Sequence, residues 1–150
     1  MKKDRNRPDS LNSDQSLPRS SILRGRNNFR RLFEKSTVLN SNSIQFRFRI
    51  YDNPGEGCKV GFAAPKKIIP KAVHRNKIKR LLREVYRTRQ SQLIDLFNSG
   101  KFGFHGLIMA KKNDLSYGDI VNDLEPMMNQ VRTILEAYLQ NQSGQSEKSI

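Results

Sequence analysis

The chain has 150 residues, with 28 Lys or Arg against 14 Asp or Glu, so its formal net charge is +14. This length suits one domain, and a hydrophobic content of only 35% predicts a small core and some unfolded chain. The single cysteine excludes an internal disulfide, and the apolar runs are too short for a membrane span. The N-terminal residues also lack the apolar segment of a secretory signal. We therefore expect a cytoplasmic protein with no membrane partner that binds a polyanion, first of all a nucleic acid.

The first half of the chain predicts an arm, a short helix and a β-hairpin. Residues 1–20 are polar and basic with almost nothing to bury, which indicates a disordered basic arm. The next apolar residues recur at helical spacing, and after them apolar and polar residues alternate as in a strand. The elements expected here are a helix over residues 23–35 and strands over residues 37–39, 43–51 and 59–64.

The second half predicts two helices around one buried strand. Periodic apolar residues indicate helices over residues 72–96 and 117–139, and a largely apolar run indicates a strand over residues 102–110. We expect residues 141–150 to form a polar disordered tail. The fold class is then α+β, a two-layer α/β sandwich in the order α-β-β-β-α-β-α, with a single domain over residues 21–140.

The positive charge is concentrated in residues 66–89. This stretch holds ten basic residues against one acid, Glu84, which is a net of +9 out of +14. A solvated helix face is the usual reading of a run of charge, but such faces normally mix signs, so the imbalance favours a binding surface. Basic residues repeat every four positions, which places them in one row along the predicted helix. The row consists of Arg75, Lys79, Arg83 and Arg87.

Neither histidine nor any carboxylate group forms a catalytic constellation. His105 lies in the apolar strand and is expected to be an interior histidine, and Cys58 an incidental thiol. Asp119 and Asp123 could bind a cation weakly, but acids that complement the start of a helix explain them better. We therefore expect no catalytic residue, no metal ligand and no cofactor on the protein.

Residues 59–84, KVGFAAPKKIIPKAVHRNKIKRLLRE, resemble the central motif of the protein subunit of bacterial ribonuclease P. The resemblance implies a fold like domain 2 of ribosomal protein S5, in which the strand–helix–strand crossover can be left-handed. It also implies a hydrolase, an endonuclease for tRNA processing that removes the 5′ leader of precursor tRNA. In that family the catalytic groups and the Mg²⁺ ions belong to the RNA subunit. The implied partners are this catalytic RNA and precursor tRNA, with no obligate protein partner.

The resemblance also assigns site residues, position by position. Those expected to contact the RNA subunit are Lys66, Lys67, Arg75, Asn76, Lys77 and Arg80. Those expected in a cleft for the single-stranded leader are Phe29, Phe33, Phe46, Lys79 and Arg83. Aromatic side chains and a basic groove suit single-stranded RNA of any sequence, although the three phenylalanines could equally belong to the core.

The sequence departs from the family pattern in the segment before the basic helix. The loop Ile69-Pro70-Lys71 is one residue longer than usual and lacks the common glycine, and Pro65 replaces the usual Ser or Thr. Two other functions stay open at this point. One is a structural RNA-binding protein of the ribosomal type, and the other is a stand-alone nuclease, which the missing acid and metal groups disfavour.

Overall fold

The computed structural model describes residues 16–149, with side chains described to residue 142, so most of the predicted arm lies outside the described residues. Two 3₁₀ helices cover Arg19–Ser21 and Pro54–Glu56. The strands are β1 (Thr37–Asn40), β2 (Ile44–Tyr51), β3 (Cys58–Ala63) and β4 (Gly103–Ala110). The α-helices are α2 (Arg26–Glu34), α3 (Ala72–Arg89), α4 (Ser91–Phe97) and α5 (Tyr117–Ser149).

The strands form one four-stranded sheet in the order β1-β2-β4-β3. β2 pairs antiparallel with β1 and β4, whereas β3 runs parallel to β4. The hairpin expected between residues 43–51 and 59–64 is therefore wrong, because β4 lies between β2 and β3. A parallel pair needs a long crossover, and α3 and α4 supply it. β4 is therefore central and paired on both sides, which explains why its sequence is apolar almost throughout.

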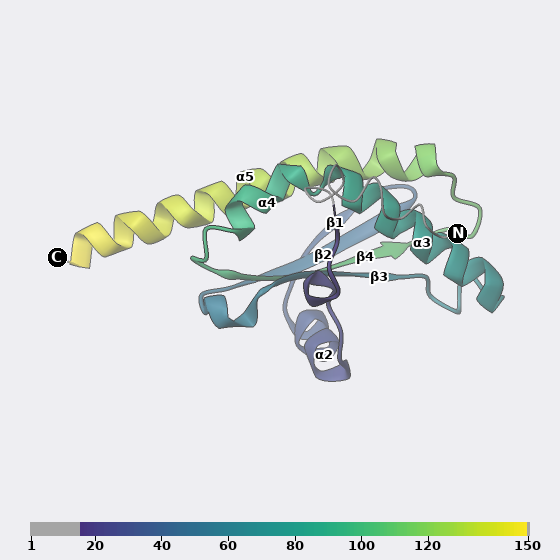
Figure 1. Ribbon diagram of the computed structural model, residues 1–150, viewed down its shortest axis with the longest axis horizontal. Coiled ribbons are helices and arrows are strands. Elements are labelled where there is room, and N and C mark those ends of the chain that lie inside the picture. Colours follow the sequence, from purple (N-terminus) through teal and green to yellow (C-terminus); the bar gives the residue numbers. More distant parts are fainter. Residues whose placement is uncertain (1–15, 150) are drawn as a thin grey trace.

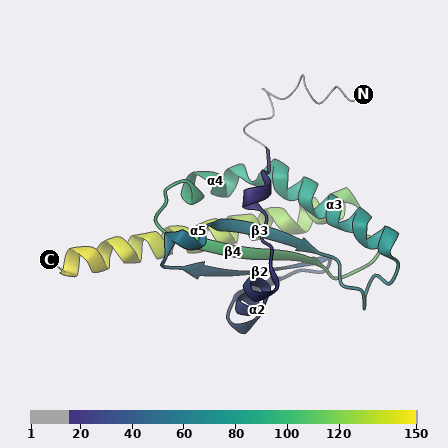
Figure 2. The same ribbon diagram turned by 60° about the horizontal axis from the view of Figure 1, so that its bottom comes forward.

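Helices cover both faces of the sheet. Figure 1 shows α3, α4 and α5 on one face and α2 on the other, and Figure 2 shows the same separation after rotation. The sequence predicted two layers, one sheet and one layer of helices. The structure adds α2 as a partial third layer on the other face of the sheet.

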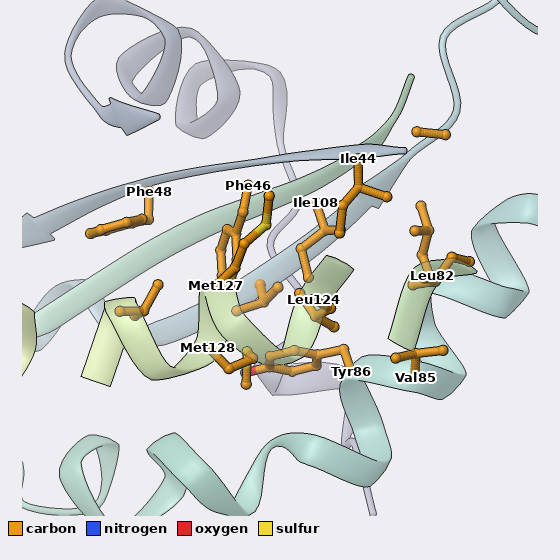
Figure 3. Close-up of a cluster of buried hydrophobic side chains, with 14 of the residues drawn as sticks. Ile44, Phe46, Phe48, Leu82, Val85, Tyr86, Ile108, Leu124, Met127 and Met128 are labelled. Carbon is orange, nitrogen blue, oxygen red and sulfur yellow. The ribbon is translucent and has the colours of Figure 1, made fainter. Parts of the chain in front are cut away.

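The main core lies between the sheet and the helices α3, α4 and α5. From β2 it receives Ile44, Phe46 and Phe48, each at most 1% exposed. Figure 3 shows Phe46 beside Met127 of α5, with Ile44 and Phe48 on the same side of the sheet. The prediction that Phe46 lines the leader cleft is therefore wrong, because its ring points to the face opposite α2 and is completely buried.

The helix expected over residues 72–96 is broken at Gln90. The Gln90 side chain is buried and donates a 2.8 Å hydrogen bond to the carbonyl of Ser16. The backbone carbonyl of Gln90 accepts hydrogen bonds from the amides of Leu93 and Ile94. The break lets α4 change direction. Phe97 at its end then packs against Phe104 of the sheet, with ring centroids 5.0 Å apart.

Both ends of the described chain carry more structure than the sequence predicts. Leu17 packs against the main core, so residues 16–20 are not part of a disordered arm. At the other end, α5 continues to Ser149 through the predicted tail and extends beyond the sheet (Figure 1). The residues of this extension are polar and have no apolar stripe, so their pattern did not predict that the helix continues. Among the described helices, none is sufficiently long and apolar to span a bilayer.

Replacing Phe46 by alanine tests its placement in the core. Because the ring is fully buried, we expect Phe46→Ala to lower the free energy of unfolding by about 3–5 kcal/mol. Phe33→Ala is the matched control, since Phe33 is 49% exposed and its loss should cost about 1 kcal/mol or less. Urea denaturation measures both values, and similar small losses would show that Phe46 is not a core residue.

Candidate nucleic-acid interface

α3 carries the basic row on the flank nearest β3. Its apolar side, with Ile78, Leu82 and Val85, is buried. Tyr86 packs against Phe62 of β3, with ring centroids 5.8 Å apart. At 100° per residue, Lys79 and Arg83 lie within about 60° of Tyr86 around the helix. These two cations therefore project beside the outer edge strand of the sheet.

The two ends of the predicted row are held by other groups of the protein. Arg75 donates from Nη1 to the carbonyls of Ile69 and Pro70, at 3.0 and 2.6 Å. Arg87 forms an ion pair with Glu84 at 2.6 Å, which lowers the pKa of that carboxyl. In the middle of the row, Lys79 and Arg83 make no hydrogen bond or ion pair with the described part of the chain, so their charges remain available.

The exposed side of the first turns of α3 extends this basic surface. The Asn76, Lys77 and Arg80 side chains are exposed, as are Lys66 and Lys67 on the turn before the helix. The structure thus places five of the six predicted RNA-subunit residues on the surface. Arg75, the sixth, is half-buried, and its Nη1 donates hydrogen bonds to the loop before α3.

The segment before α3 follows a defined path despite its departure from the family pattern. The amides of Ile68 and Ile69 donate to the carbonyl of Pro65, at 3.1 and 2.8 Å. The Ile69 side chain is fully buried and anchors the turn in the core. Lys66 and Lys67 therefore project from an ordered turn.

The predicted leader cleft falls between α2 and the other face of the sheet, where Phe29 and Phe33 lie. Leu32 of α2 is buried with Leu23 and Leu107 of β4. Phe29 packs above Gly61 of β3, where an added Cβ would stand 3.5 Å from the ring. Phe33, one turn further on, is 49% exposed. α2 therefore presents the exposed ring of Phe33 and the half-buried ring of Phe29.

Arg47 and Arg49 of β2 face this cleft, and the residue-by-residue comparison missed them. The Arg47 guanidinium carbon lies 4.6 Å from the centroid of the Phe33 ring, and its Nη1 donates to Ser36 Oγ at 3.1 Å. Arg49 donates to the carbonyl of Arg31 at 3.1 Å. The alternation of β2 already separates these arginines from Phe46, so the signal was present in the sequence.

An ion pair holds α2 on the sheet. Arg31 donates two hydrogen bonds to Glu56, at 3.1 and 2.6 Å. These bonds lower the pKa of the Glu56 carboxyl, although burial acts in the opposite direction. The guanidinium carbons of Arg31 and Arg49 also lie 4.7 and 4.6 Å from the Tyr51 ring centroid. A bidentate pair of this kind fixes direction as well as distance, so it sets the position of α2.

The remaining titratable groups have structural roles. His105 is 1% exposed, as expected of an interior histidine, its Nε2 lies 3.1 Å from the carbonyl of Glu56, and burial lowers its pKa. Ser116 and Asp119 exchange hydrogen bonds at the start of α5, while Asp123 accepts from Ser41 Oγ and the Ser43 amide. Among the described residues, no group of three or more His, Cys, Asp or Glu could hold a metal ion.

The fold and its surface define a basic RNA-binding protein of the α+β class, with cations on one helix and with phenylalanine and arginine side chains on the opposite face of the sheet. A family model described as Ribonuclease P matches residues 17–132. The chain therefore belongs to the ribonuclease P protein family, whose members are subunits of an endoribonuclease that processes tRNA and work with the ribonuclease P RNA. The alternative function, a structural RNA-binding protein of the ribosomal type, is therefore not favoured.

Relatives named ribonuclease P protein component support this membership. The protein of Chlorobaculum tepidum is 31% identical over 139 residues, which is 89% of each chain. That of Legionella pneumophila strain Corby is 33% identical over 107 residues, or 71% of this chain and 88% of the relative. Two solved RNase P proteins share the fold. The Staphylococcus aureus protein (TM-score 0.58, 21% identity) covers 74% of this chain and 94% of its own, and the Thermotoga maritima protein (0.57, 22%) covers 73% and 96%.

Replacing Glu56 by glutamine tests the attachment of α2. The carboxylate contribution should be fully present above the ordinary glutamate pKa of 4.5 and lost as the pH falls through the lowered value, because protonation removes the charge that Arg31 binds. We expect Glu56→Gln to speed amide hydrogen exchange in α2 at pH 7. Urea midpoints of the wild type and Glu56→Gln should differ at pH 7 and converge as the pH falls below the lowered pKa of Glu56. A difference that stays constant over this range would contradict the charge-based attachment.

Proposed function

We propose that this chain helps a catalytic RNA to remove the 5′ leader of precursor tRNA, while the RNA and its Mg²⁺ ions carry out the hydrolysis. The observation that carries the proposal is the separation of two RNA-binding features on one small scaffold. One is the basic surface of α3, and the other is the aromatic and basic cleft under α2. A structural RNA-binding protein needs only the first of them.

The basic surface of α3 is assigned to the RNA subunit. Its contacts are phosphate contacts, for which arginine and lysine are suited. Arg75 holds the preceding loop with Nη1 and can offer its remaining N–H groups to phosphate. The assigned residues are Lys66, Lys67, Arg75, Asn76, Lys77 and Arg80.

The cleft under α2 is assigned to the single-stranded leader. The exposed ring of Phe33 offers a stacking surface for a base of any type, and Phe29 lies one turn away. Arg47 replaces Phe46 in this assignment, because it lies on the α2 side of β2 with its guanidinium over the Phe33 ring. Lys79 and Arg83, at the β3 edge, supply charge for the leader backbone.

The same proposal extends to finer features of the fold and to location. We assign the fold to the class of ribosomal protein S5 domain 2, with a left-handed crossover from β3 to β4. The parallel pairing of these strands, connected by α3 and α4, supports a crossover of the strand–helix–strand type. We also propose a cytoplasmic location, where precursor tRNA is processed.

Reconstitution tests the division of labour between protein and RNA. The protein alone should not cleave precursor tRNA, and adding it to the Chlorobaculum tepidum ribonuclease P RNA at low Mg²⁺ should accelerate leader removal. Cleavage by the protein without any RNA subunit would reject the proposal. Arg80→Ala should weaken RNA binding about tenfold and reduce the log–log salt slope by about 0.7–0.9. Lys101→Ala is the control, since it removes an exposed charge before β4 and should have no effect.

Leader recognition is tested by comparing precursor and mature tRNA. Phe33→Ala, Arg47→Ala and Lys79→Ala should each weaken binding of the reconstituted enzyme to leader-bearing tRNA more than to mature tRNA. For Phe33 the lost stacking amounts to about 1–3 kcal/mol. Phe33→Tyr keeps a π-face and should bind normally. An equal effect on both tRNAs would show that the cleft does not hold the leader.

A further inference from the structure

Two exposed aliphatic side chains lie inside the basic surface. Val73, the second residue of α3, is 75% exposed, and Ile68 on the preceding turn is 39% exposed. In the described chain the other large apolar residues with comparable exposure are Phe33, Val38 and Tyr117. Single exposed apolar residues are ordinary on protein surfaces. This pair requires an explanation because it lies within a cationic surface, where an apolar side chain contributes nothing to binding a phosphate.

The backbone that presents Ile68 and Val73 is fixed. The fully buried Ile69 side chain anchors the turn between them, and both amides of Ile68 and Ile69 bond to the Pro65 carbonyl. From the helix side, Arg75 binds the carbonyls of Ile69 and Pro70. The two aliphatic side chains therefore stand on an ordered segment, so ordering the backbone would cost little when a partner binds.

The charge around this pair selects the partner. The sequence has no Asp or Glu between Glu56 and Glu84, whereas Lys66, Lys67 and Lys71 are exposed beside the pair. A polyanion complements this field. Phosphates pair with the lysine charges, but contact with an aliphatic group adds nothing to their binding. The partner must therefore also offer an apolar surface close to its phosphates, and in RNA that surface is the face of a base or the carbon side of a ribose.

We propose that Ile68 and Val73 pack against an unpaired nucleotide of the RNA subunit while the neighbouring lysines hold the adjacent phosphates. An unpaired nucleotide presents the face of its base as well as its ribose, whereas in an A-form helix the base faces are stacked on one another. Aliphatic side chains contact unstacked bases in this way in other nucleic-acid complexes. This contact rests on the proposed binding of the RNA subunit to α3. It adds a subsite for a nucleotide to a surface that otherwise recognises only charge.

The contact is distinct from the leader cleft. α3 and α2 lie on opposite faces of the sheet (Figures 1 and 2). The leader residues on α3, Lys79 and Arg83, lie more than one helical turn after Val73. Phe33 and Val38 face the α2 side, and Tyr117 begins another helix. Leader binding and the proposed nucleotide contact can therefore be disturbed independently.

Val73→Ala tests the proposal without endangering the fold. Alanine is the better helix former and Val73 is mostly exposed, so the variant should unfold at the wild-type temperature or above. In a titration with the Chlorobaculum tepidum ribonuclease P RNA, we expect a three- to tenfold loss of affinity, somewhat less than the roughly 15-fold loss expected for two fully buried methylene equivalents. The log–log salt slope should stay unchanged. Lys67→Ala, by contrast, should reduce the slope by about 0.7–0.9, as expected for one phosphate contact.

A charged chain without bases and a distant variant complete the experiment. Inorganic polyphosphate should bind Val73→Ala and the wild type equally, because it offers no apolar face. Tyr117→Ala, on the first turn of α5, should bind the RNA normally. An unchanged RNA affinity of Val73→Ala, or an equal loss towards polyphosphate, would overturn the nucleotide contact and leave the pair to a protein partner. If the wild type itself did not bind the RNA, the proposed function would fail instead.

Discussion

The packing of α3 on the sheet is the interaction on which the remaining structure depends. Ile78, Leu82 and Val85 are buried against the core, and this burial holds the opposite side of the helix at the surface. Like charges spaced four residues apart on a helix repel each other by a few tenths of a kcal/mol per pair. Burial of three aliphatic side chains, at about 1.5–3 kcal/mol each, exceeds that repulsion. A cationic surface can therefore exist on a small domain before any RNA is present.

The period-two alternation of β2 creates the second feature. Its even-numbered side chains, such as Phe46 and Phe48, complete the core, while Arg47 and Arg49 face α2. The ion pair between Arg31 and Glu56 then holds α2 over that face. One strand thus supplies both the packing that stabilises the sheet and the arginines that face α2. Its two faces have different partners because helices cover the sheet on both sides.

Patterns within single elements allowed most of the fold to be predicted. Apolar periodicity located the four strands, α3 and α5, and the charge imbalance identified the side of α3 that stays exposed. Phe46 was misplaced because alternation shows which residues share a face but not which face α2 covers. The break at Gln90 and the extension of α5 were missed for a related reason. The first depends on a contact with Ser16, 74 residues away, and the second lacks an apolar stripe.

The acid-free stretch between Glu56 and Glu84 has a consequence for the free protein. Its charges destabilise the folded state by mutual repulsion, and any bound polyanion relieves that repulsion, so assembly and folding are thermodynamically linked. Added electrolyte acts in opposite directions on the two processes. It screens the isolated chain and favours its native state, yet it competes with RNA for the same cations. The protomer on its own is consequently most fragile in the dilute buffers in which its ribonucleoprotein is tightest.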